Sequence, residues 1–333
     1  MRKISIFASN SIEMKKIIGL FAFMFLLNGC DDGDLIIETI DFADVTATKC
    51  EINGLVYKIK ENEVLIIEIP EDENAFIGTV TPFGEPRQFT IGGDNKVIYR
   101  SYSGTIENEN VCSTIPPSSP NVTEEWVATS GVIQITTTPI LVPNTTLTSG
   151  NATKIKGYNH AIVFKNVTFD KPNGEQFFET YVFGSYAKDL LSSETLPFAF
   201  DDEVEKCTSG NTVYNTSGSE ALVLNLDPTF FPAASGTQTA LISATNKVAY
   251  TLYTAGGLTS ANFCTTTAPT TPAISQIWNA KDGVTATSGI IEVVTTTLGS
   301  QFQHTIHLKK VTFNRNGSEF YLGDDYIYGS FIQ

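Results

Sequence analysis

Histidine is the side chain best suited to acid–base or metal chemistry near neutral pH, and this chain of 333 residues contains three. His160 and His304 occupy equivalent places in a repeated pattern described below. Such a pair could bind a metal ion or a haem group, but a histidine on a strand more often makes a structural hydrogen bond. His304 and His307 are three residues apart on an expected strand, so their side chains point to opposite faces. We therefore expect no metal and no cofactor, and keep His160 and His304 as candidates for facing a ligand.

Carboxylates are the other candidates for catalysis, and they gather in three acidic runs. A glycosidase needs two acids about 5–10 Å apart across a cleft, and no run has an equally acidic equivalent elsewhere in the chain. The sequence contains no calcium loop, serine-nucleophile elbow, zinc-protease helix, phosphate loop or dinucleotide fingerprint. Solvated loop charge is the simpler interpretation of the runs. They are Glu71-Asp72-Glu73, Asp201-Asp202-Glu203 and Asp324-Asp325.

Aromatic side chains crowd two strands that close the two halves of the pattern. Alternate residues of a strand face opposite sides of its sheet, so some of these rings lie outside the core if the others fill it. Exposed rings could stack on sugars or receive a partner protein, whereas cross-strand packing explains the same residues. The candidates for facing a glycan or protein ligand are Tyr181, Phe183, Tyr326 and Tyr328.

Many residues recur in the same order along the chain, with small changes in offset. Each half also contains a Thr-Ser-Gly turn followed by an apolar run that ends in three threonines. Ordered matches of this kind predict a duplication followed by insertions and deletions in loops. Two copies are too few for a solenoid, so each copy is expected to bury its own core. Among the matches are Cys50/Cys207, Tyr57/Tyr214, Glu63/Glu220, Cys112/Cys264, Trp126/Trp278, His160/His304 and Tyr186/Phe331.

Within each expected copy, short apolar runs alternate with turn signals, and no sustained helical periodicity follows the N-terminal segment. Asn173-Gly174 and Asn316-Gly317 each separate two strand-like runs, which predicts two hairpins. The copies are expected to span 35–188 and 189–333. The predicted fold is therefore all-β, with two tandem copies of one antiparallel β-sandwich or open-barrel domain.

Four of the five cysteines fall two to a copy at equivalent positions. No Cys-x-x-Cys pair occurs, which argues against zinc. Disulfides Cys50–Cys112 and Cys207–Cys264 are the simplest arrangement that a duplication can preserve in an oxidising compartment. The other two pairings would cross the copies, and buried free thiols are a further alternative.

The fifth cysteine, Cys30, follows a targeting segment over residues 1–29. Lys15 and Lys16 precede an apolar run over 17–27, which is shorter than the roughly 20 residues that span a bilayer. The run ends in Leu27-Asn28-Gly29-Cys30, which resembles a lipobox. The resemblance covers about the first 35 residues, and it implies cleavage before Cys30 and acylation of its thiol. Met14 is an alternative start of translation.

The acidic run Asp31-Asp32-Gly33-Asp34 directly follows Cys30, so 30–34 is an expected tether. A run of this kind resembles the surface-export signal of lipoproteins in the Bacteroidota, the phylum that includes the flavobacteria. In enteric bacteria, aspartate after the cysteine instead resembles an inner-membrane retention signal, and a simple flexible tether is a third interpretation. We favour an outer-membrane lipoprotein exposed at the cell surface.

The net charge of −15 argues against nucleic acid and anionic lipid as partners, because both repel an acidic chain. We therefore expect the chain to contact the membrane only through the acyl chains on Cys30. We expect a non-catalytic binding or structural module with two similar domains for a glycan or protein ligand, because linked weak sites raise avidity. The alternative is an extracytoplasmic hydrolase of polysaccharide or peptide that depends on carboxylates.

Overall fold

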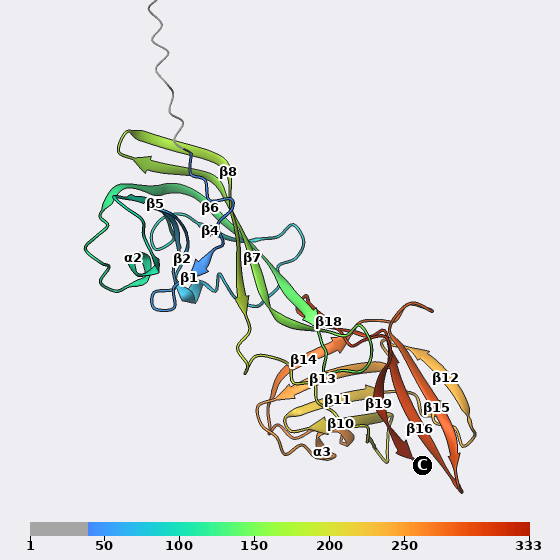
Figure 1. The fold of residues 1–333 in the computed structure, drawn as a ribbon. Coiled ribbons are helices and arrows are strands. Elements are labelled where there is room, and N and C mark those ends of the chain that lie inside the picture. The colour runs from blue at the N-terminus through green and yellow to red at the C-terminus, as the bar shows by residue number, and fades with distance from the viewer. Residues whose placement is uncertain (1–38) are drawn as a thin grey trace, which may run out of the picture. The chain divides into compact units, whose positions relative to one another are not determined.

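The computed structural model describes residues 39–333, of which Phe42–Gln333 form one compact unit (Figure 1). The predicted targeting segment 1–29 and the predicted tether 30–34, which begins with Cys30, lie outside the described residues. Strands make up 52% of the described residues and helices 5%, so the all-β prediction is confirmed. In the described part, no helix is long and apolar enough to cross a membrane.

The first region, residues 48–189, forms one eight-stranded sheet in the order β1-β2-β3-β5-β6-β7-β8, with β4 paired to β6. All of its strand pairs are antiparallel. Two short helices, η1 (Glu71–Glu73) and α2 (Asn108–Cys112), interrupt the strands. The strands are β1 (Thr48–Lys49), β2 (Val56–Lys60), β3 (Glu63–Glu68), β4 (Arg87–Thr90), β5 (Lys96–Tyr102), β6 (Val122–Pro143), β7 (Thr153–Lys171) and β8 (Gly174–Asp189).

Strand β6 is 22 residues long and pairs with different strands along its length. Its first part pairs with β5 and its middle with β4, and the pairing with β7 shifts register around Gly131. Gly131 has a φ of 120°, and a Cβ there would lie 2.8 Å from Cα of Val167. Only glycine fits this close approach of two backbones, which bends the long strand.

The second region, residues 205–332, contains a seven-stranded sheet, β18-β17-β14-β13-β11-β10-β9, and a four-stranded sheet, β12-β15-β16-β19. Leu222 and Tyr250 of the first sheet and Ile291 and Ile306 of the second belong to one buried core, so this region is sandwich-like. Its elements are β9 (Glu205–Lys206), β10 (Thr212–Ser217), β11 (Glu220–Asn225), η2 (Pro228–Phe230), β12 (Gly236–Leu241), β13 (Lys247–Tyr253), α3 (Ala261–Cys264), β14 (Ile274–Ala280), β15 (Ile290–Leu298), β16 (Gln301–Lys309), β17 (Thr312–Arg315), β18 (Ser318–Tyr321) and β19 (Tyr326–Ile332).

The order of strand pairing is the same in both regions, apart from breaks in the long strands. β14 and β15 together take the place of β6, β16 and β17 that of β7, and β18 and β19 that of β8. The two strand-like runs on either side of Asn316-Gly317 are each interrupted, because Lys310 (φ 52°) and Gly323 (φ 115°) leave the extended conformation. In the first region the equivalent strands continue through the bend.

Both predicted hairpins form. β17 and β18 pair Arg315 with Ser318 around Asn316-Gly317, and both loop residues have positive φ, as a type I′ turn requires. In the first region Lys171 pairs with Gly174, so the two-residue loop begins one residue earlier than the Asn-Gly pair.

Two disulfides join Cys50 to Cys112 and Cys207 to Cys264, which confirms the predicted pairing. The Cα atoms are 5.4 Å apart in each. Each bridge closes a loop that does not leave its own region. In the chain-entropy model, closing loops of this length stabilises the fold by about 4 kcal/mol each.

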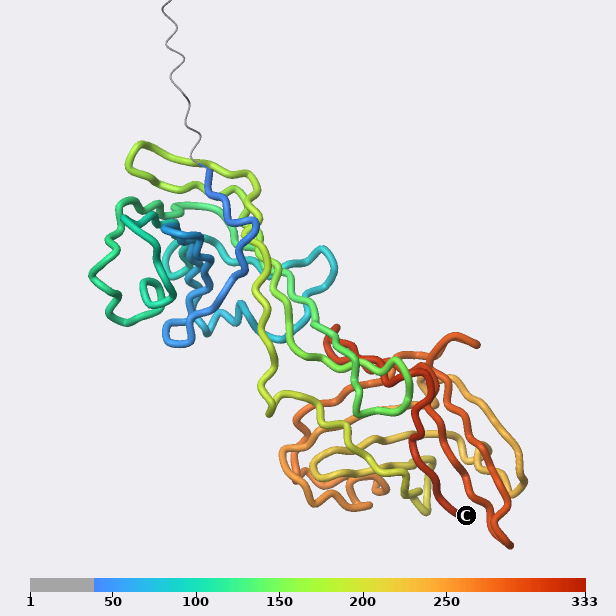
Figure 2. The backbone as a smooth tube through the Cα atoms, viewed as in Figure 1, coloured from blue at the N-terminus to red at the C-terminus, as the bar shows by residue number. Residues whose placement is uncertain are grey.

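The second region does not bury its core with its own residues alone. Ile155 and Tyr158, near the start of β7, belong to the buried core of the second region. The Tyr158 hydroxyl lies 3.0 Å from Oγ of Ser318, and the backbone N–H of Tyr321 donates to Thr153 at 2.9 Å. Figure 2 shows the end of the β6–β7 hairpin beside β18. The expectation that each copy buries its own core is wrong for the second region, because the end of the β6–β7 hairpin supplies Ile155 and Tyr158 to that core.

Replacing Tyr158 with alanine is expected to lower the free energy of unfolding by about 3–5 kcal/mol, since it removes a large buried ring. Urea unfolding followed by far-UV circular dichroism measures the loss. Phe177→Ala on the neighbouring strand is the control, because the Phe177 side chain is 57% exposed. A loss below about 1 kcal/mol for Tyr158→Ala would mean that the hairpin contact is only superficial.

Candidate functional site

The structure buries most of the side chains that the sequence suggested as facing a ligand. They lie on inward faces of strands, where they fill the cores, and only Tyr181 keeps an appreciable exposed fraction. A buried side chain cannot contact a ligand in this conformation. The ligand-facing role of these residues is therefore not supported by their burial and stays a prediction. The exposed fractions are 0% for His160, 1% for His304, 1% for Phe183, 9% for Tyr326 and 0% for Tyr328.

His160 is held by a buried hydrogen-bond network. It stands opposite Thr137 in the β6–β7 pairing, and its Nδ1 lies 2.8 Å from the Thr137 hydroxyl. Arg87 donates to that same hydroxyl, which leaves the hydroxyl proton free to bond to Nδ1. The ring hydrogen is then on Nε2, which has no hydrogen-bond partner among residues 39–333.

Aromatic rings surround the His160 imidazole. Tyr186 stands opposite it on β8 and stacks on it with ring centroids 5.8 Å apart. Phe76 meets both rings edge to face, at 5.5 Å from each. Burial, with the nearby charges of Arg87, Lys188 and Lys49, lowers the pKa of His160 to about 4. The imidazole is therefore neutral at pH 7.

Arg87 also fixes the segment that carries Phe76. Its guanidinium donates to the carbonyls of Ala75 and Thr79, at 3.2 and 2.9 Å. These two carbonyls flank Phe76, so the network that holds His160 also holds the ring that covers it. We name residues 74–81 the pocket segment.

The second region repeats the arrangement around His304. Thr295 stands opposite His304, with its hydroxyl 2.9 Å from Nδ1. Phe231 and Phe331 pack on the imidazole with centroids 5.4 and 5.1 Å away. Nε2 of His304 also has no partner among residues 39–333. Burial and the charge of Lys206 lower the pKa of this histidine as well.

Sequence reasoning found the two histidines but missed most of their surroundings. Thr137 and Thr295 belong to the repeated runs of three threonines, and this repetition was a sequence signal that could have pointed to them as partners of the histidines. Lys49 and Lys206 each directly precede an equivalent cysteine, which is a second signal. Phe76 and Phe231 lie in loops with no matching neighbours, and only the structure brings them to the histidines.

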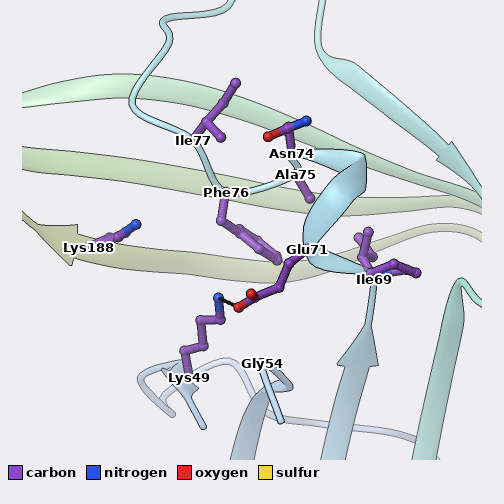
Figure 3. Close-up of a pocket in the computed structure, with 10 residues that line it drawn as sticks. Lys49, Gly54, Ile69, Glu71, Asn74, Ala75, Phe76, Ile77 and Lys188 are labelled. Atoms are coloured by element: carbon purple, nitrogen blue, oxygen red, sulfur yellow. Dashed lines mark hydrogen bonds and ion pairs between the residues drawn. The ribbon is translucent and has the colours of Figure 1, made fainter. Parts of the chain in front are cut away.

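A surface pocket lies over Phe76 in the first region (Figure 3). Its volume is about 220 Å³, below the ~300–1,000 Å³ of sites for drug-sized ligands. It has two cations, one carboxylate, one amide and one aromatic ring. The residues that line it are Lys49, Gly54, Ile69, Pro70, Glu71, Asn74, Ala75, Phe76, Ile77 and Lys188.

A different pocket, of about 520 Å³, lies beside Phe331 in the second region. Lys206 lines it together with two carboxylates, Glu203 and Glu205. The repeated aromatic and histidine groups therefore lie next to pockets of different charge.

The acidic residues do not form a catalytic arrangement in the described part of the chain. The three side chains of η1 are exposed, and Asp325 pairs with His307 at 2.8 Å. Residues 39–333 contain no group of three or more histidine, cysteine, aspartate or glutamate side chains that could hold a metal ion.

Glu220 is the buried acid with the most distinctive environment. The Tyr250 hydroxyl donates to it at 2.6 Å and the N–H of Phe198 at 2.8 Å. Burial raises the pKa of Glu220 above its ordinary range. The side chain is 4% exposed, so its carboxyl group is closed off from a substrate. Tyr99 and Glu63 form the equivalent pair in the first region.

The depressed pKa of His160 predicts a loss of stability in acid. The unfolded chain binds a proton at about pH 6.5, whereas the folded chain binds one only near pH 4. This contribution is complete above pH 6.5 and is lost as the pH falls toward 4. From pH 7 to 4.5 we expect the wild-type chain to lose about 2–3 kcal/mol more than His160→Gln.

Unfolding free energies at several pH values measure the difference, and an NMR titration of the His160 ring checks its cause. His307→Gln is the control, because His307 is partly exposed. A His160 ring that titrates near pH 6.5 would contradict the prediction.

Comparisons with known proteins add no family to this description. No protein-family model, no curated protein and no solved structure matches the chain significantly. The described geometry is therefore the basis for the function proposed below.

Proposed function

We propose that this chain is a lipid-anchored extracytoplasmic lipoprotein that binds a ligand without catalysis. The observation that carries the proposal is the set of lysine, phenylalanine, histidine and threonine side chains that recurs in both regions, each time next to a surface pocket. In both, the histidine is buried and lies under aromatic rings, which suits a rigid wall for a ligand more than a catalytic base. The accessible pocket in the first region combines an aromatic ring with charged groups, as binding sites commonly do.

We infer further that the two regions are tandem copies of one ancestral domain. The common order of strand pairing, the equivalent disulfides and the two Thr–His pairs support this inference. The different charges of the two pockets indicate that the copies have diverged. We therefore do not expect both copies to bind one ligand with equal affinity, and we do not propose avidity between them.

The membrane anchor is tested at Cys30. Cys30→Ala is expected to abolish incorporation of labelled fatty acid and to leave the chain uncleaved, because the acylated thiol is what the signal peptidase recognises in a lipobox. Asp44→Ala, which changes an exposed residue outside the signal and leaves both disulfides intact, is the control. Normal acylation and cleavage of the Cys30 variant would refute the anchor.

Surface exposure is tested by adding protease to whole cells. Protection of the unmutated protein from this protease would place it on the periplasmic side.

Ligand binding is tested with the chain from residue 31, which keeps the compact unit 42–333 whole. Glycan and protein arrays are expected to give a saturable signal that Phe76→Ala reduces. Bound glycans and peptides are then incubated with the protein and analysed for cleavage. Hydrolysis of a bound compound would favour the carboxylate-dependent hydrolase, and the absence of any saturable binding would overturn the proposal.

A further inference from the structure

The pocket over Phe76 gathers positive charge in a strongly acidic chain. Lys49 and Lys188 come from opposite ends of the first region and line the same small hollow. The charged neighbours that act on the adjacent His160 are Arg87, Lys188 and Lys49, and all are cations. With a net charge of −15 on the whole chain, this is a local reversal of sign.

Both lysines are available to a ligand. Lys49 pairs with Glu71 at 3.3 Å, but the Glu71 side chain is 81% exposed. An exposed ion pair of this kind contributes little to stability, so a ligand carboxylate can replace Glu71 at little cost. Lys188 is exposed and has no carboxylate within ion-pair distance in the part of the chain that the structure describes.

The aromatic wall of the pocket is rigid. Phe76 packs edge to face against His160 and Tyr186, and Arg87 holds the backbone on both sides of it. The register of the β7–β8 pairing also fixes the residues beneath Phe76. His160 pairs with Tyr186 and Tyr158 with Lys188 in the β7–β8 ladder, so all four side chains share one face. A ring that is already ordered costs little entropy when a ligand stacks on it.

From these groups we infer that the pocket binds one uronic acid residue of an acidic saccharide. The sugar ring packs on Phe76, and its carboxylate lies between Lys49 and Lys188. The volume of about 220 Å³ suits a single sugar ring. This inference rests on the proposed binding function and adds the class of ligand.

The second region provides an internal comparison. Its pocket also contains a lysine, Lys206, but Glu203 and Glu205 line the same hollow. Two carboxylates repel an anionic sugar, so the uronic acid site belongs to the first region alone.

The test uses the chain from residue 31 and isothermal titration calorimetry. The probes are oligosaccharides of galacturonic, glucuronic, mannuronic and guluronic acid, each beside its carboxyl-reduced, neutral form. At least one acid form is expected to bind with one equivalent per chain, and its neutral form at least about tenfold more weakly, since a charge-assisted hydrogen bond is lost.

Lys188→Ala is expected to weaken binding of the acid form about tenfold and leave the neutral form unchanged. Phe76→Ala should weaken both forms. Lys165→Ala is the matched control, because Lys165 is outside the pocket and bonds to Thr180. Circular dichroism confirms that each variant is folded.

Three outcomes would overturn the inference. They are equal binding of acid and neutral forms, no effect of Lys188→Ala, and binding to none of the saccharides. If an array then finds a neutral glycan or a peptide carboxylate as the ligand, the uronic acid inference fails and the binding function stands. If neither titration nor array detects a ligand, the binding function fails as well.

Discussion

Tyr158 joins three parts of this molecule. Its ring lies in the core of the second region, and its hydroxyl reaches Ser318. A Cβ at Gly78, within the pocket segment, would lie 2.5 Å from Cε2 of this ring, so the backbone there can approach only because residue 78 is glycine. Two residues further along β7 lies His160, beneath Phe76. One buried tyrosine therefore links the core of the second region to the pocket of the first.

This link joins the two similar regions within the one compact unit, Phe42–Gln333. Duplicated domains commonly keep separate cores and contact each other through modest polar surfaces. Here the β6–β7 hairpin contributes apolar side chains to its neighbour, while both disulfides stay within their own regions. The repeated Thr–His pairs are buried and hydrogen-bonded in both regions, whereas the charges of the residues that line the two pockets differ. On the proposed duplication, the two copies kept a common scaffold while the charges at their pockets diverged.

The all-β class, both hairpins and both disulfides followed from residue patterns. Turn residues determine a hairpin locally, and the four cysteines stand at equivalent positions of the repeated pattern. The burial of His160 and Phe183 did not follow, since alternation along a strand does not say which face is covered. The insertion of Tyr158 into the second core was also missed. That contact joins positions 160 residues apart, and no local pattern records it. The pocket needs Phe76, Lys49 and Lys188 together, and these residues come from a loop and from two strands, β1 and β8, that only the fold brings to one place.

The central claim, that residues 42–333 fold as one unit through the Tyr158 contact, can be tested with the two tryptophans of the chain. Trp126 lies in the first region and Trp278 in the second, and both are buried. Single-tryptophan variants, Trp126→Phe and Trp278→Phe, report on one region each during urea unfolding. In each variant, the tryptophan fluorescence and the circular dichroism of the whole chain should change with the same midpoint. Separate midpoints for fluorescence and circular dichroism would contradict the account, because the regions would then unfold independently.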